Sequence, residues 1–477
     1  MMAMTSSHSS AGTWWRRGIL RAVAGMIVVV ATIVVAGTTW GTSALAAPAS
    51  TTTWLGYHGG GIGAGVAAGV RAVDTSARRW TSPVLDGQLY GEPVVVGDEV
   101  FVATENDTVY ALSATNGAIR WARHLARAVP SNLLPCGDIS PLVGITGTPV
   151  IDPTRHELFV MAFEIDHGVA RHFLYGLDVT SGARMMRRVI TTPTPDQLPY
   201  LNRSGLALDH GAVIYSFGGN YGDCPTYHGV VGAVAESGMG PSSSYVVDHG
   251  AGQSQGAVWM GGAAPAVDAA GNVWVTSGNG SVTSPGQPYD HSDGVLELTP
   301  TMHLKAFFAP STWAQDNAND ADLSAQPVVL ANGLVVATGK SGHVYLLRAG
   351  HLGGVGGQIA TIDAGCGNVL DGGYALRANL VYLPCYAGPV AVRVTAKPAT
   401  VSVVWRAAAG GGPPIVAAHE VWSIGNDGVL YGFNPNNGTV VQHAALGSLA
   451  NHFSTPSVGD GLMLAAIARQ VVAFAAR

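Results

Sequence analysis

Charged side chains are scarce in this chain of 477 residues, because Asp, Glu, Lys and Arg together make up only 11% of it. There are three lysines, Lys305, Lys340 and Lys397, and the formal net charge is −6 at pH 7. No basic run lies beyond the N-terminal segment, so the chain lacks the electrostatic footprint of a nucleic-acid-binding protein. Hydrophobic residues nevertheless reach 47%, a content that excludes a disordered chain.

The first 47 residues have the pattern of a targeting segment. A basic stretch, Arg16–Arg21, which resembles a twin-arginine signal, precedes an apolar run from Ala22 to Gly37, and Ala44-Leu45-Ala46 supplies small residues before a cleavage point. We expect a cleavable signal peptide; the alternative is an uncleaved N-terminal membrane anchor drawn from Ala22 to Ala47. Either reading exports the body of the protein, outside the cell or into the cell envelope.

Cysteine is also rare, with four residues in the whole chain and no Cys-x-x-Cys pair. That absence removes support for a thiol redox motif, a zinc knuckle or a c-type haem site. An even number of cysteines in an exported protein favours disulfides over free thiols. We predict one disulfide between Cys366 and Cys385, which can close a hairpin, and another between Cys136 and Cys224.

Glycine, in contrast, is abundant at 64 residues, and short alternating strands are joined by Gly-containing turns. One phrase recurs: Val109–Gly117, followed by Trp121, is repeated at Leu174–Gly182 and at Leu430–Gly438. Weaker copies begin at Val230, Gly294, Val344, Val390 and Val471, about 40 to 65 residues apart, which makes eight copies in all.

Such repeats predict an all-β fold, an eight-bladed β-propeller of four-stranded antiparallel blades spanning residues 79–477. A β-sandwich also has many short strands, but it does not repeat this phrase. The last copy supplies three strands, and we expect the stretch Arg79–Pro83 to supply the fourth and close the ring. Residues 48–78 are predicted to be a Gly-rich linker packed against the disc. Its Gly61-x-Gly63-x-Gly65 has no preceding strand and no βαβ unit, which argues against a phosphate loop.

The phrase Tyr-Ala-Leu-x-Ala-Thr-x-Gly-x-x-x-Trp at Tyr110–Trp121 resembles the repeat of the pyrroloquinoline-quinone (PQQ) dehydrogenase superfamily. The resemblance covers nearly all of residues 79–477 and is specific for the fold. It is not specific for a cofactor, since the superfamily includes PQQ- and calcium-dependent alcohol dehydrogenases as well as cofactor-free scaffold propellers.

The resemblance implies a site made of four residues in family order. Glu164 and Asn279 are implied as calcium ligands, because Ca²⁺ prefers oxygen ligands. Asp320, in the run Asp316–Asp322, is implied as the base that removes an alcohol proton. Lys340 is implied as the contact to the quinone oxygens, where charge appears on reduction.

Each of these residues also has a simpler interpretation. Glu164 can be a solvated loop carboxylate, Asn279-Gly280 a turn, Asp316–Asp322 a surface loop or a calcium site without redox function, and Lys340 part of a hairpin turn. The chain departs from the family as well: the adjacent Cys pair beside the cofactor is absent, Trp259 lies about three residues early for the aromatic platform, and Asn319 replaces a Trp.

Two functions follow from these observations. The sequence slightly favours an exported, non-catalytic binding or scaffold module, which we expect to be a monomer that binds a protein or a glycan on one face. The alternative is a PQQ- and calcium-dependent dehydrogenase that oxidises an alcohol or a sugar.

Overall fold

The computed structural model describes residues 53–224, 227–365, 372–451 and 453–477. The chain divides into two units, Met1–Ala47 and Pro48–Arg477, and the described residues all belong to the second. The predicted signal segment therefore lies outside them. Within the described ranges, no helix combines the length and the apolar character needed to cross a membrane.

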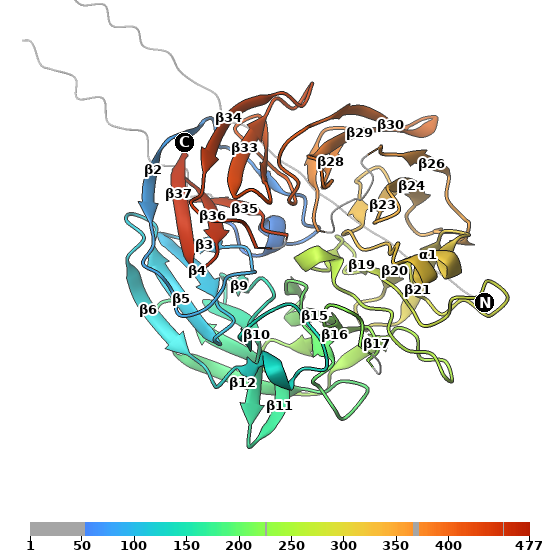
Figure 1. Ribbon diagram of the computed structural model, residues 1–477, viewed down its shortest axis with the longest axis horizontal. Coiled ribbons are helices and arrows are strands. Elements are labelled where there is room, and N and C mark those ends of the chain that lie inside the picture. The colour runs from blue at the N-terminus through green and yellow to red at the C-terminus, as the bar shows by residue number, and fades with distance from the viewer. Residues whose placement is uncertain (1–52, 225–226, 366–371, 452) are drawn as a thin grey trace, which may run out of the picture. The chain divides into compact units, whose positions relative to one another are not determined.

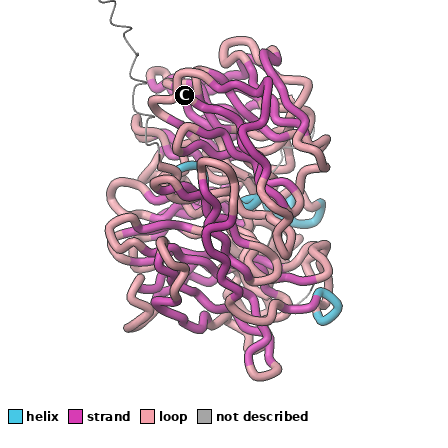
Figure 2. Tube along the Cα trace, turned by 90° about the vertical axis from the view of Figure 1, so that its left-hand side faces the viewer, coloured by secondary structure: helices cyan, strands magenta, loops and turns pink. Residues whose placement is uncertain are grey.

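Eight antiparallel sheets, each with a core of four strands, follow one another along the chain and form the predicted eight-bladed propeller (Figure 1). Figure 2 shows that strands predominate in the described chain and that helices are few and short. The blades, numbered from the N-terminal side and each given from its inner to its outer strand, are β3(Val94–Val96), β4(Glu99–Ala103), β5(Thr108–Ser113) and β6(Ile119–His124) in blade 1; β9(Val150–Asp152), β10(Glu157–Asp166), β11(Val169–Asp178) and β12(Arg184–Ile190) in blade 2; β14(Ala207–Asp209), β15(Ala212–Gly219), β16(Val230–Ala235) and β17(Ser243–Val246) in blade 3; β18(Ala266–Val267), β19(Val273–Ser277), β20(Gly294–Leu298) and β21(Leu304–Ala309) in blade 4; β22(Val328–Val329), β23(Leu334–Thr338), β24(His343–Arg348) and β26(Ala360–Asp363) in blade 5; β27(Ala375–Arg377), β28(Leu380–Leu383), β29(Val390–Ala396) and β30(Ala399–Arg406) in blade 6; β31(Ile415–Ala417), β32(Glu420–Ile424), β33(Val429–Phe433) and β34(Val440–Ala445) in blade 7; and β35(Pro456–Gly459), β36(Leu462–Ile467), β37(Gln470–Ala476) and β2(Val73–Thr81) in blade 8.

A few short elements lie outside this four-strand pattern. They are β1(Val66–Ala67), which pairs with β31, β13(Tyr200–Leu201), which pairs with β15, β25(Gly354–Val355), which pairs with β21, the hairpin of β7(Val129–Pro130) and β8(Leu142–Val143), the helix α1(Trp313–Asn319), and the 3-10 turns η1(Tyr57–Gly59), η2(Ser131–Leu133) and η3(Met260–Gly262). Several of them come before or between blades and, as shown below, surround the candidate site.

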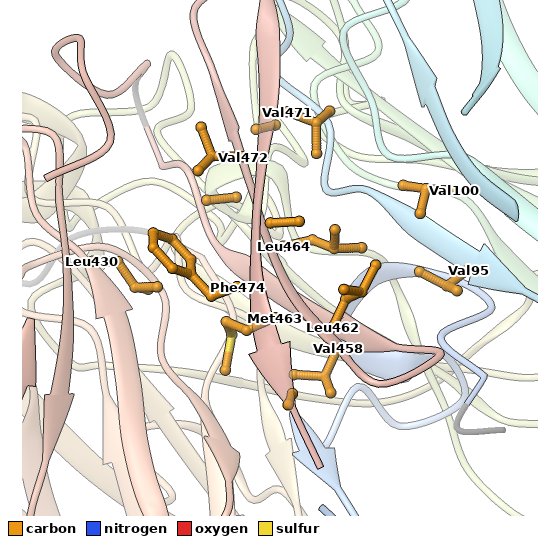
Figure 3. Close-up of a cluster of buried hydrophobic side chains, with 14 of the residues drawn as sticks. Val95, Val100, Leu430, Val458, Leu462, Met463, Leu464, Val471, Val472 and Phe474 are labelled. Carbon is orange, nitrogen blue, oxygen red and sulfur yellow. The ribbon is translucent and has the colours of Figure 1, made fainter. Parts of the chain in front are cut away.

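The ring closes as the sequence predicts, because β2 from the N-terminal side pairs antiparallel with β37 at the C-terminus. Figure 1 shows this as a blue strand beside a red one. A buried apolar cluster continues across the junction from blade 7 to blade 1, and Leu430, Leu464, Phe474 and Val100 are among its side chains (Figure 3). Closure therefore joins the two ends of the described chain through both a strand pairing and a continuous core.

The Gly and the Trp of the repeated phrase meet across neighbouring blades. Trp80 in the outer strand of blade 8 lies over Gly117 of blade 1, and its indole N–H donates to Ala114 O at 2.7 Å. Trp121 lies in the same way over Gly182 of blade 2. Trp405 and Gly438 form the equivalent pair between blades 6 and 7. The phrase is therefore a device for packing one blade against the next, and the closing junction uses it too.

The segment Trp54–Ala67 differs from the predicted linker, because it runs inside the ring. Its backbone bonds to the inner strands of five blades in order: Trp54 to Val95, Leu55 to Ile151, Gly61 to Val267, Ala64 to Leu376 and Gly65 to Val416. The turn η1 of this segment is the short blue helix near the middle of Figure 1.

Two glycines of this segment are required by close contacts. A Cβ on Gly63 would lie 2.5 Å from the Gln326 side chain, and one on Gly65 would lie 2.7 Å from Tyr374 O. Both have φ near +60°. These glycines serve backbone packing, in agreement with the argument against a phosphate loop.

The predicted disulfide between Cys136 and Cys224 is formed, with a Cα–Cα distance of 6.0 Å. Cys385 is buried in the core beside β28. Its predicted partner, Cys366, lies outside the described residues, so the second disulfide stays a prediction.

Candidate functional site

A pocket of about 440 Å³ is enclosed by the connections of blades on opposite sides of the ring. We call it the central pocket, and its lining residues are Tyr90, Asp138, Ile139, Leu201, Arg203, Gly219, Tyr221, Gly222, Asp223, Trp259, Gly261, Asn279, Asp320, Lys340 and Phe453. Its size lies within the usual range for small-molecule sites, and it combines aromatic rings with a few convergent polar groups.

Three of the four predicted site residues reach this pocket from different elements. Asn279 follows β19 of blade 4, Asp320 caps the C-terminus of α1 with φ +53°, and Lys340 stands in the turn between β23 and β24 of blade 5. Residues separated by about 60 positions in sequence are thus brought together by the ends of two neighbouring blades.

These three side chains form one hydrogen-bonded group. Lys340 Nζ lies 2.6 Å from Asp320 Oδ1 and 2.9 Å from Asp322 Oδ1, and Asn279 Nδ2 donates to Asp320 Oδ1 at 2.8 Å. Partial burial acts to raise the pKa of Asp320, but the hydrogen bond and the charge of Lys340 hold that pKa below its usual value. Asp320 is therefore an ionised carboxylate at neutral pH.

The Asn279 side chain has an amide oxygen in need of a partner. The residue is 7% exposed, and Asn279 Oδ1 has no hydrogen-bond donor within the described ranges. A buried carbonyl oxygen without a donor is costly, and a ligand or a cation in the pocket would satisfy it.

Trp259 supplies an aromatic wall despite its early position in the sequence. Its indole N–H donates to Gly219 O at 2.9 Å, which fixes the ring. A Cβ on Gly218 would lie 2.4 Å from its Nε1 and one on Gly278 3.0 Å from its Cζ3, so both glycines make room for the ring. The indole is thus held at the pocket, where a flat ligand can stack on it.

Glu164, the fourth predicted residue, does not line the pocket. It lies in β10, is 1% exposed, forms an ion pair with Arg187 and accepts the Tyr175 hydroxyl at 2.6 Å. Its predicted role as a calcium ligand stays a prediction, and the carboxylate is already satisfied by these partners.

A different carboxylate, Asp223, follows β15 of blade 3 and lines the pocket. Burial raises its pKa, while the hydrogen bond from Tyr227 and the charge of Lys340 oppose the increase. The side chains of Asp223, Asn279 and Asp320 therefore offer oxygens on one side of the pocket, a set of donors that suits a hard cation. Within the described part of the chain, no group of three or more His, Cys, Asp and Glu side chains is arranged to hold a metal.

Arg203 is a second pocket residue that the sequence did not reveal. It is 8% exposed, and its guanidinium lies 5.2 Å from the Tyr90 ring centre and 5.1 Å from that of Phe453. Stacking on two aromatic rings holds the guanidinium in place. The lining of the pocket thus contains two cations, Arg203 beside aromatic rings and Lys340 beside carboxylates.

Comparisons with known proteins agree with this architecture. The sequence profile of the outer membrane protein assembly factor BamB family matches residues 35–199. No curated protein sequence matches the chain.

Solved structures match most of the propeller at low sequence identity. A quinohemoprotein alcohol dehydrogenase from Pseudomonas putida aligns with a TM-score of 0.68 at 12% identity, over 89% of this chain and 80% of that one. A europium-containing methanol dehydrogenase aligns at 0.64 and 13% identity, over 89% and 98%. BamB from Moraxella catarrhalis aligns at 0.55 and 14% identity, over 85% and 100%. At identities this low, the structural similarity demonstrates a common fold alone. The similar structures include both an assembly factor and dehydrogenases.

Proposed function

This chain is a PQQ-like β-propeller by fold and by repeat, and from that premise we propose that it binds a planar quinone of the PQQ class in the central pocket and oxidises an alcohol or a sugar with it. One observation carries the proposal: Asn279, Asp320 and Lys340, picked from the sequence in family order, converge with Trp259 on a single pocket.

The lining residues fit such a ligand in shape and in charge. Trp259 offers an indole for a flat ring, and Arg203 and Lys340 offer positive charge for carboxylates or carbonyl oxygens. Three carboxylates, Asp138, Asp223 and Asp320, line the same pocket. An anionic ligand would be repelled by them unless a cation binds with it, so binding should depend on a divalent cation.

In the proposed oxidation of an alcohol, each of these lining residues would have a separate role. A bound quinone would supply the hydride acceptor. Lys340, whose ammonium lines the pocket, would stabilise negative charge on the oxygens of the ligand. Asp320 would accept the proton of the alcohol hydroxyl. Asn279 Oδ1, which has no donor within the described ranges, would help to hold the cation.

A second function, the non-catalytic binding module, is favoured by the contacts of Asp320. Lys340 and Asn279 both donate to its Oδ1, and the resulting low pKa makes Asp320 a weak base. In that case the pocket, or another part of a propeller face, would bind a partner without chemistry, outside the cytoplasm.

Dye reduction separates the two functions. Protein supplied with PQQ and Ca²⁺ should reduce an artificial electron acceptor when given a panel of alcohols and sugars, and Lys340→Met should abolish the reaction. Lys305→Met is the matched control, because Lys305 pairs with Glu297 in blade 4 and is absent from the pocket lining. PQQ binding without dye reduction on any substrate would support the non-catalytic function.

A further inference from the structure

Two loops that are far apart in sequence supply part of the lining of the central pocket, and we call these two loops the rim. The first, residues 134–141, connects η2 to β8, and the second, residues 220–224, follows β15 of blade 3. Asp138 and Ile139 of the first loop line the pocket, as do Tyr221, Gly222 and Asp223 of the second.

The disulfide between Cys136 and Cys224 joins these two loops across a sequence separation of 88 residues. Every rim residue named above lies within three positions of one of its cysteines. The loops also touch there, since a Cβ on Gly222 would lie 3.7 Å from Cys136 Sγ. The covalent link is therefore placed where it can set the distance between the two sides of the rim.

Backbone hydrogen bonds hold each loop mainly near its base. In the first loop, Ser131 N donates to Pro141 O at 2.9 Å, which closes the loop at its stem. In the second, Asn220 N donates to Pro199 O at 3.2 Å, and Asp223 N donates to Asn220 O within the loop. Neither set links one loop to the other, whereas the disulfide does.

The cysteines of this link are partly exposed, because Cys136 and Cys224 are both half-buried while Cys385 is 1% exposed. A disulfide that is partly exposed can be attacked by a thiolate from solution. In that exchange a dithiol reductant gives two electrons: the Cys136–Cys224 bond breaks, each sulfur takes a proton, and the reductant becomes a disulfide.

We propose that the Cys136–Cys224 disulfide positions the rim of the central pocket, and that its reduction by a dithiol loosens the rim and weakens ligand binding. The proposal deepens the proposed function and rests on it for the identity of the ligand. Asp223 is the residue through which the link would act most directly, because it is adjacent to Cys224 in sequence and lines the pocket.

The test compares the double variant Cys136→Ser/Cys224→Ser with the matched control Cys366→Ser/Cys385→Ser, both checked for a folded β-sheet spectrum. Hydrogen exchange is followed in peptides covering residues 131–143 and 219–224, with β30 as an internal reference. PQQ affinity is measured in the presence of Ca²⁺. We expect faster exchange in both rim peptides, unchanged exchange in β30, and PQQ affinity lowered by about tenfold or more in the first variant alone.

Mild dithiol treatment of the unmodified protein should reproduce these changes, and reoxidation should reverse them. Rim exchange that is the same with and without the disulfide would overturn the proposal. If the oxidised protein does not bind PQQ while rim exchange still responds to reduction, the proposed function fails and the positioning of the rim stands.

Discussion

The ring of His172 gives the protein a pH dependence that can be worked out from its surroundings. The residue lies in β11, is 1% exposed, stacks on Phe163 at 4.0 Å and meets the edge of Phe217 at 4.7 Å. Its Nδ1 lies 3.1 Å from Gln197 Oε1, and its Nε2 has no hydrogen-bond partner within the described ranges. A proton on Nε2 would therefore be buried without an acceptor, and burial lowers the pKa of His172 from 6.5 to about 3.

Because the pKa of His172 is lower in the folded chain than in the unfolded chain, the unfolding free energy falls as the pH falls. Between pH 6.5 and 3 the unfolded chain binds a proton at His172 that the folded chain does not. The stabilisation is complete above pH 6.5 and is lost as the pH falls towards 3. At about 1.36 kcal/mol per pH unit, His172 alone should cost about 2 kcal/mol of unfolding free energy between pH 7.5 and pH 5.

Urea unfolding of the unmodified chain and of His172→Phe, measured at several pH values, isolates this contribution. The phenylalanine ring keeps the stack and does not titrate, and the backbone N–H at this position still donates to Gln197 Oε1, at 2.7 Å in the structure. We expect the difference in unfolding free energy between the two proteins to shift by about 2 kcal/mol over this range, with the unmodified chain losing more. Parallel profiles would refute the reasoning about the buried ring.

Three further predictions concern packing and hydrogen bonding. Gly117→Ala should lower the unfolding free energy by about 1 to 3 kcal/mol more than Gly97→Ala, because both glycines have positive φ but only a Cβ at Gly117 would meet a neighbour, the Trp80 ring at 2.5 Å. Equal losses in denaturant unfolding would contradict the inter-blade contact. Tyr57→Phe should lower the unfolding free energy by about 1 to 3 kcal/mol, since it removes the acceptor of the buried Gly373 N–H at 2.9 Å, whereas Tyr221→Phe at a 71% exposed position should have no measurable effect. Similar melting temperatures for the two variants would argue against an inserted N-terminal segment. Serine at both Cys136 and Cys224 should lower stability by about 4 to 5 kcal/mol, the loop-closure value for a separation of 88 residues; a loss below about 1 kcal/mol in chemical unfolding would mean that this bond does not constrain the unfolded chain.

The fold is predictable from the sequence because the repeated phrase encodes a physical contact. The Gly at 117 and the Trp at 80 belong to different copies, yet each copy carries one half of the same inter-blade pair. The periodic spacing therefore predicts both the strands and their packing. It also identifies β2 as the strand that closes the ring.

Residues 54–67 escaped this reasoning because they carry no strand period. The ring that surrounds these residues determines their course. The glycines that led to the prediction of a Gly-rich linker packed against the disc allow close backbone approach instead.

The candidate site was predictable in the parts that family order locates. Asn279 and Lys340 each follow the second strand of a blade, β19 and β23, at matching positions of the repeat. Asp320 lies in the connection between those two blades, so its place in the family order located it and the repeat did not. Asp223 and Arg203 come from connections whose length varies between blades, and no periodic signal marks them. Glu164 has the expected place in the order, but Arg187 on β12, two strands away in the same blade, engages its carboxylate.

The central claim is that the central pocket holds a quinone of the PQQ class, and calorimetric titration of PQQ into the oxidised protein with Ca²⁺ tests it most directly. We predict saturable binding of one molecule per chain, dependence on the cation, and loss of binding in Trp259→Ala, whose ring lines the pocket. Absence of binding by the unmodified protein, or equal binding by the Trp259 variant, would contradict the claim.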